Sequence, residues 1–373
     1  TGTVCCYGST EKSQDKEQST DQTDPEAAEG MLEEIEFGEI QKMVDELLGE
    51  QSFSLKEAVI NMINGEEPIS KEAVRGVLYS FFFSGLENEK TLFFRLLLLV
   101  LLAAVLAGFV DVFENGQIGA VSFYVVYLVL FMMLMEAFGR LSSTLTVRLN
   151  WLGEFMKTLA PAYFLAVSTA NGVSTAAVFY EGVLLLVWMI QWVLVNFLLP
   201  GVNLCILLKM VNYLSKEEML SKMSELLEVV ISWALKTLIG LAVGLQVVKN
   251  LVAPVMDSLK RTAVGKTAGA IPGIGNAVNA ITQLILTSAV LVRNSFGAVI
   301  LVLIAAAGLQ PLIHYGALSL SYRFLAALAQ PVSDKRIVGA LSTMGEGCAW
   351  LLKLLLTAQI LCMLAFLVLM AGG

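Results

Sequence analysis

Charged side chains are scarce in this 373-residue chain: Asp, Glu, Lys and Arg make up 15% of it, against 57% hydrophobic residues. A water-soluble domain carries about a quarter charged residues. The composition therefore excludes an ordinary soluble protein and predicts an integral membrane protein. The net charge of −8 also excludes the concentrated basic surface that nucleic-acid binding requires.

The motifs of common enzymes are missing as well. The sequence contains no G-x-S-x-G elbow and no H-E-x-x-H pair. Gly265-Lys266-Thr267 resembles the end of a phosphate-binding loop, but Lys260 stands where that motif needs glycine. The dinucleotide fingerprint that begins at Gly273 lacks its third glycine, because Val278 occupies the position. We expect no enzymatic activity, no nucleotide site and no cofactor.

Histidine and cysteine are too few, and too poorly spaced, for a metal centre. His314 is the single histidine, which excludes a two-histidine metal site. Three of the five cysteines, Cys205, Cys348 and Cys362, lie in apolar runs, where a thiol acts as a small hydrophobic group. Cys5 and Cys6 are adjacent near the first residue. We expect no disulfide framework and no metal.

Acidic residues concentrate at the start of the chain. Residues 1–90 hold 7 basic and 20 acidic side chains, whereas residues 91–373 hold 17 and 12. We expect three parts: a disordered linker at 1–30, an acidic region of short amphipathic helices at 31–90, and a polytopic membrane domain at 91–373. The chain begins with Thr1 rather than Met, and a removed signal sequence is the favoured explanation over a truncated chain.

The acidic region shows helical periodicity in two places. In the first, apolar residues recur at helical spacing: Leu32, Ile35, Ile40, Met43, Val44 and Leu47. In the second, Ser54 is followed three residues later by Glu57, which is the pattern of a capping box at the start of a helix. So small a set of apolar residues does not predict an independently folding domain.

Eight apolar stretches are candidate spans, since about 20 apolar residues of helix cross a hydrocarbon core of about 30 Å. They lie at 92–113, 118–138, 160–180, 182–208, 229–248, 284–308, 311–329 and 349–371. The stretches at 160–180 and 311–329 are weaker. The sequence therefore predicts an all-α polytopic bundle of six to eight spans, in which 160–180 crosses the bilayer, re-enters it or lies flat.

Two connecting segments, 140–157 and 209–228, are amphipathic, and we expect them to lie in the membrane interface or to pack on the bundle. The connectors 140–157 and 249–266 are both positively charged and should both face the cytoplasm. An even number of crossings must then separate them. This requirement favours a re-entrant or flat 160–180.

Polar residues inside predicted spans are candidate functional residues. Arg293 and Asn294 lie in the middle of the sixth stretch, where a cation costs about 2.5 kcal/mol or more. We expect Arg293 to line or gate a pore or to form a buried pair, with Glu136 and Glu181 as candidate partners. The alternative is a helix broken near Asn294, which would bring Arg293 close to the interface.

Three further cations lie in predicted spans. Arg323 is a candidate pore-lining or paired residue. Lys236 and Lys353 lie within one or two turns of span ends, so we expect them to extend toward the interface.

Glycines spaced four residues apart form two edges where helices can approach closely. Gly240 and Gly244 form one such edge. The segment at 257–279 carries the other, which Pro272 and two glycines then interrupt. The candidate packing or hinge residues of this second edge are Gly265, Gly269, Pro272, Gly273 and Gly275.

The segment KRTAVGKTAGAIPGIGNAVNAITQLILTSAVLVRNSFG at 260–297 closely resembles the stage III sporulation protein AE family of endospore-forming bacteria. The layout of an acidic helical region followed by a polytopic body agrees with this family. The resemblance implies a non-enzymatic membrane component of a secretion-like channel complex between mother cell and forespore. It also implies a location on the mother-cell side, in the outer forespore membrane.

The partners that the resemblance implies belong to the same complex: ring-forming subunits, small membrane subunits, an ATPase and a forespore channel partner. We also expect a homo-oligomer. Two alternatives stay open. One is a self-contained secondary transporter, which the Gly/Pro interruption at 272–275 would suit. The other is an assembly platform without conduction, in which the Arg293→Leu substitution would change neither assembly nor sporulation.

Overall fold

The computed structural model describes residues 37–48, 54–64, 116–171, 173–214, 220–264 and 275–371, with Leu32 and short helical pieces between positions 91 and 105. Within these residues every regular element is a helix, as the sequence predicts. The predicted linker at 1–30 and the glycine-rich segment at 265–274 lie outside the described residues.

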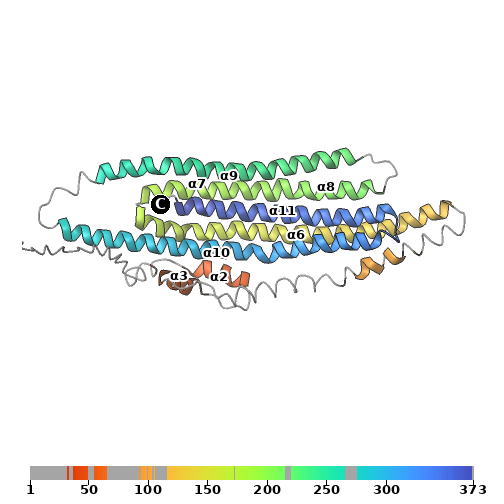
Figure 1. Cartoon of the computed structure of the whole chain (residues 1–373), viewed down its shortest axis with the longest axis horizontal. Coiled ribbons are helices and arrows are strands. Elements are labelled where there is room, and N and C mark those ends of the chain that lie inside the picture. The colour runs from red at the N-terminus through yellow and green to blue at the C-terminus, as the bar shows by residue number, and fades with distance from the viewer. Residues whose placement is uncertain are drawn as a thin grey trace, which may run out of the picture.

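Long helices aligned along one axis make up the bundle (Figure 1). They are α6 (Gly116–Asn171), α7 (Val173–Val193), a π-helical turn η1 (Leu194–Leu198), α8 (Leu199–Asn212), α9 (Ser221–Val264), α10 (Gly275–Ala329) and α11 (Lys335–Ala371). Helix α9 lies at one edge and is the least buried of the long helices, whereas α11 lies in the middle of the bundle and packs closely on α10.

Helix α6 is continuous across a region where the sequence predicts two spans and a connector. Its 56 residues correspond to about 84 Å of helix. The predicted connector 140–157 is the middle of this helix, so the expectation that it links two spans is wrong, whereas its packing on the bundle is confirmed. The helix continues because 139–160 contains no proline, and because its apolar side packs against α7, α10 and α11.

The predicted 160–180 stretch is a helical hairpin rather than a span or a re-entrant segment. Its first part ends α6 at Asn171, and its second part begins α7 at Val173. The two helices then run antiparallel, since Gly153, 18 residues before Asn171, lies against Gln191, 18 residues after Val173. The polar residues near Asn171, which make this stretch a weak candidate span, lie where the chain reverses its direction. The requirement for an even number of crossings between 140–157 and 249–266 no longer applies, because 140–157 is not a connector between spans.

Helix α10 likewise joins two predicted spans, 284–308 and 311–329. It passes through Pro311, although a proline inside a helix costs about 3 kcal/mol. Packing against α11 along much of its length stabilises it. Gln359 of α11 donates a side-chain hydrogen bond to the Ile304 carbonyl, and Gly297 lies against Met370.

The core consists of apolar side chains from all the long helices, and tyrosines connect them. The Tyr127 hydroxyl donates to the Met210 carbonyl at 2.6 Å and joins α6 to α8. The Tyr315 hydroxyl donates to the Leu141 carbonyl at 2.8 Å and joins α10 to α6. The described cysteines, Cys205, Cys348 and Cys362, are buried and form no disulfide with one another, which confirms their predicted behaviour as small hydrophobic groups.

Two short helices lie beside α10 at the edge opposite α9: α2 (Gly38–Leu48) and α3 (Leu55–Ile63) (Figure 1). The Glu57 amide donates to the Ser54 hydroxyl at 3.3 Å, so Ser54 caps α3 as the sequence predicts. The Leu55 amide donates to Gln41 Oε1 at 2.8 Å and joins the two helices. The ring of Phe37, which precedes α2, lies 5.6 Å from that of Phe296 on α10.

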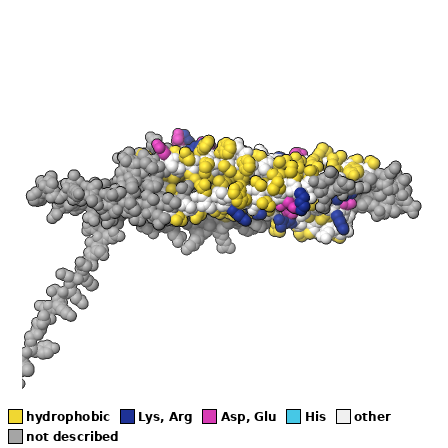
Figure 2. Space-filling view, turned by 90° about the horizontal axis from the view of Figure 1, so that it is seen from above, with side chains coloured by type: hydrophobic (Ala, Val, Ile, Leu, Met, Phe, Trp, Pro, Cys, Tyr) yellow, Lys and Arg dark blue, Asp and Glu magenta, His cyan; other side chains and the backbone are white. Residues whose placement is uncertain are grey.

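Five segments among the described residues are long and apolar enough to cross a membrane. They are Tyr124–Pro161, Glu181–Asn212, Ser221–Gly244, Thr287–Ala329 and Lys335–Met370. Residues 92–113, the first predicted span, are described only in part. Viewed from the side of α9, the bundle surface is mainly hydrophobic, with charged side chains in a few groups (Figure 2).

Candidate functional site

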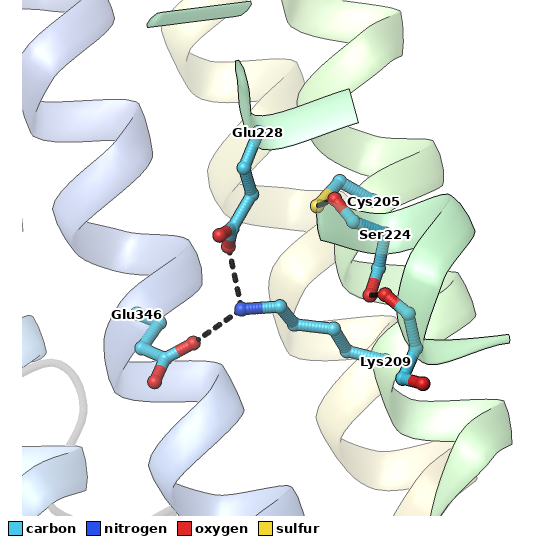
Figure 3. A network of polar contacts seen from close by, with 6 residues as sticks. Cys205, Lys209, Ser224, Glu228 and Glu346 are labelled. Carbon is cyan, nitrogen blue, oxygen red and sulfur yellow. Dashed lines mark hydrogen bonds and ion pairs between the residues drawn. The ribbon is translucent and has the colours of Figure 1, made fainter. Parts of the chain in front are cut away.

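A cluster of charged side chains joins three helices near the end of α8. Lys209 of α8 extends toward Glu228 of α9 and Glu346 of α11 (Figure 3). Its Nζ atom lies 2.5 Å from Glu228 Oε1 and 2.8 Å from Glu346 Oε2. The three side chains are 21%, 29% and 41% exposed, respectively. We call these three residues the ion cluster.

The surroundings of the ion cluster hold the start of α9 against α8. The Cys205 thiol donates to the Ser224 backbone carbonyl at 3.6 Å, and the Ser224 hydroxyl donates to the Ser221 carbonyl at 2.8 Å. The Leu220 amide donates to Asn212 Oδ1 at 3.1 Å. The backbone positions of α8 and α9 are thus fixed on both sides of Lys209.

The ion cluster contains two carboxylates and one ammonium group, so its formal charge is −1. Taking charges out of water is costly, and attraction between them offsets this only in good geometry. The arrangement therefore fixes how α8, α9 and α11 lie relative to one another. No sequence pattern predicts it: Lys209 and Glu228 bound a predicted amphipathic segment, but their approach to Glu346 depends on tertiary packing.

Arg293 and the ion cluster lie at different positions along the bundle axis, and we call these positions the two polar levels. Arg293 is half-buried on α10, and its Nε and Nη2 atoms both lie 3.4 Å from Asn294 Oδ1. The helix is not broken at Asn294. Tyr163 of α6 stacks on the neighbouring Phe296 with ring centroids 6.1 Å apart. Burial raises the pKa of the Tyr163 hydroxyl above its ordinary value, and Arg293 acts in the opposite direction.

The predicted acidic partners of Arg293 lie elsewhere. Glu136 forms an ion pair with Arg140 at 3.8 Å on the exposed side of α6. On α6, the helix that carries Glu136, Tyr163 lies at the level of Arg293, because it stacks on Phe296. Tyr163 is 27 residues from Glu136, which corresponds to about 40 Å of helix. Glu181 is exposed on α7.

Arg323 is exposed on α10, and the first carbons of its side chain lie against Gly345 of α11. Gly240 and Gly244 are exposed on α9, and a Cβ atom added at either would meet no other atom within 4 Å. Gly275 is the first residue of α10. The other predicted packing or hinge residues, Gly265, Gly269, Pro272 and Gly273, lie outside the described residues.

The two polar levels are separated by about the thickness of a membrane. The Ser319 hydroxyl of α10 donates to the carbonyl of Gly345, the residue before Glu346, at 2.8 Å and so marks the level of the ion cluster. Phe296 marks the level of α2 and Arg293. The 23 residues between Ser319 and Phe296 correspond to about 35 Å of helix.

Comparison with known proteins gives one family. The sequence model of the family described as stage III sporulation protein AE matches residues 53–373. A similar curated protein is stage III sporulation protein AE of Bacillus subtilis (strain 168), which is 22% identical over 372 residues that cover 99% of this chain and 93% of the relative. No solved structure matches.

Proposed function

Because the chain belongs to the stage III sporulation protein AE family, we propose that it is a non-enzymatic, multi-pass membrane subunit of the sporulation complex that connects mother cell and forespore. It acts there as a conduit or as an assembly subunit, on the mother-cell side in the outer forespore membrane. The family match over residues 53–373 is the observation that carries the proposal.

The spacing of the two polar levels supports a fixed position of the bundle in the bilayer. The ion cluster and the level of Arg293 are about 35 Å apart, close to the hydrocarbon thickness of about 30 Å. Thr287–Ala329 alone is 43 residues, or about 65 Å, so it cannot lie wholly inside the hydrocarbon. We place the hydrocarbon between the two levels.

The short helices α2 and α3 support the same placement. Their inner sides are buried, with Val44, Leu55 and Val59 almost inaccessible to solvent. Their outer sides carry exposed charges: Glu39, Lys42, Asp45, Glu46, Lys56 and Glu57. Such a surface is too costly to place among acyl chains. The part of the bundle next to Phe296 therefore projects out of the hydrocarbon, and Arg293 lies near its boundary.

A homo-oligomer and partners from the same sporulation complex are part of the proposal. The open side of α9 at Gly240 and Gly244 supports contact with another membrane helix, because small residues four apart allow backbones to approach closely. Glycines inside a helix otherwise lower its stability by about 1 kcal/mol each.

The experiment is a measurement of mass and composition. The full-length protein, purified in mild detergent from cells that make the whole complex, should elute as an oligomer together with other proteins of that complex. A strictly monomeric species that brings no partner with it contradicts the proposal. Purification from cells that lack the other subunits provides the control, and self-association should then persist without them.

A further inference from the structure

The exposed side of α6 is polar over a length that matches the hydrocarbon. Between positions 136 and 157 the exposed residues recur every three or four positions. They are Glu136, Gly139, Arg140, Ser143, Thr144, Val147, Asn150, Glu154 and Lys157. Val147 is the single large apolar residue among them. We call these residues the polar strip; its 21-residue length corresponds to about 32 Å.

The charges of the polar strip already form pairs within the helix. Glu136 lies 3.8 Å from Arg140, and Glu154 lies 3.0 Å from Lys157. Their side chains are 45–72% exposed. Glu136 and Arg140 lie at the level of the ion cluster, because Leu141 beside them accepts from Tyr315. Glu154 and Lys157 lie between the two polar levels, where a charged side chain costs up to about 2.5–3.5 kcal/mol, the value at the bilayer centre. With Ser143, Thr144 and Asn150 between the two pairs, the polar strip does not suit contact with acyl chains.

The neighbouring helices have an apolar exposed surface at the same level. Gln191 of α7 donates to Asn150 Oδ1 of the polar strip at 3.2 Å, so the two surfaces share one position along the bundle. From α7 to α8 the large exposed side chains are hydrophobic: Leu185, Trp188, Trp192, Phe197 and Leu204. This surface suits acyl chains over about 29 Å. The exposed surface of α7 and α8 thus fits lipid, whereas the polar strip on the neighbouring α6 does not.

A cavity of about 340 Å³ opens beside the polar strip, between α6 and the segment formed by η1 and α8. Its lining is partly apolar, with Val195 and Leu199, and partly polar, with Ser142, Ser143, Thr146 and Asn203. Ser142 is only 5% exposed, and the buried Oδ1 atom of Asn203 has no hydrogen-bond partner among the described residues. A water molecule needs about 30 Å³ and two to four polar partners. The cavity therefore has both the room and the polar groups to hold several waters.

We propose that the polar strip faces water within the membrane, and that several copies of this chain, with their strips turned toward a common axis, enclose an aqueous passage. The chemistry of the wall is mixed, with two acids, two bases and several hydroxyl and amide groups, which suits water-filled space without strong preference for one sign of charge. This inference rests on the proposed function, because the passage requires assembled copies.

Single-cysteine variants test the proposal. In the full chain with its five native cysteines replaced by alanine, Ser143, Val147 and Asn150 are changed one at a time to cysteine. Trp188, Trp192 and Phe197 at the same level receive the same change as matched controls. A charged, membrane-impermeant methanethiosulfonate is then applied to membranes that contain assembled protein of established mass.

We expect cysteines of the polar strip to react at least about tenfold faster than the controls, since an apolar environment raises a thiol pKa and each unit lowers the reactive thiolate tenfold. Equal and slow reaction would mean that the polar strip is dry and would overturn the proposal. Equal and fast reaction would mean that no bilayer lies at this level, which also overturns it. An oligomer with an unreactive strip contradicts this inference alone, whereas a monomer contradicts the proposed function as well.

Discussion

Lys209 is the residue on which the contact between three helices depends. Its ammonium group lies between the carboxylates of Glu228 and Glu346. Without it, these two negative charges would face each other. A partly buried ion pair stabilises a fold only modestly, but loss of one partner leaves uncompensated charge. The residue is therefore more sensitive to substitution than its net contribution to stability suggests.

Replacement of Lys209 by methionine should lower the stability of the bundle. We expect the free energy of unfolding to fall by less than about 3–5 kcal/mol, the loss seen for fully buried pairs, because Glu346 is 41% exposed. The midpoint of thermal unfolding in detergent measures it. Adding Glu228→Gln and Glu346→Gln should restore most of the loss, and failure to do so would contradict an electrostatic cause.

The matched control is Lys222→Met. Lys222 pairs with Glu225 at 2.8 Å on the outside of α9, where the side chains are 86% and 59% exposed. Exposed pairs of this kind contribute about 0–1 kcal/mol, so this variant should unfold close to the parent.

Tyr163 tests the cost of a polar atom without a partner. Its hydroxyl is buried and makes no hydrogen bond to a described residue. Tyr163→Phe should therefore leave the unfolding midpoint unchanged or raise it. Tyr315→Phe, which removes the 2.8 Å bond to Leu141, should lower stability by about 1 kcal/mol. Equal losses in the two variants would show that Tyr163 has a partner in the folded membrane protein.

At the scale of elements, α10 and α11 pack closely because glycines remove side chains from their contact. A Cβ atom at Gly345 would lie 3.1 Å from the Ser319 carbonyl oxygen and 2.8 Å from Arg323 Cγ. At Gly347 it would lie 2.7 Å from Phe138 of α6. These two glycines flank Glu346 and allow it to approach Lys209.

The Gly345→Ala substitution should force α10 and α11 apart. We expect a loss of about 1–3 kcal/mol, the usual effect of overpacking, despite the better helix propensity of alanine. Gly182→Ala on α7 is the control, because a Cβ atom there meets nothing within 4 Å. Thermal unfolding in detergent should distinguish them, and equal behaviour would contradict the close contact at Gly345.

At the scale of the whole molecule, the proposed bilayer position predicts which tryptophans contact lipid. Trp192 is 53% exposed on α7 between the two polar levels, whereas Trp151 is half-buried and stacks on Phe155 at 5.2 Å. In variants that retain a single tryptophan, bromines on lipid acyl chains should quench Trp192 strongly and Trp151 weakly. Equal quenching would place the hydrocarbon elsewhere along the bundle.

The class of molecule and the family follow from the amino-acid sequence alone. Long apolar runs and few charges can be satisfied only by helices in lipid, and the 260–297 segment is distinctive enough to identify the family from residues alone. The Ser54 cap was also predictable, because it depends on residues only three positions apart.

Where the helices end and which polar residues meet depend instead on how the helices pack. Proline and polar residues inside α6 and α10 weaken helices locally, but packing against α7 and α11 keeps them continuous. Glu346 approaches Lys209 across 137 positions of sequence. Periodicity reports which side of a helix is apolar, not which helix covers it. The polar strip is therefore recognisable as exposed only from the packing of α7 and α8, which leave it uncovered.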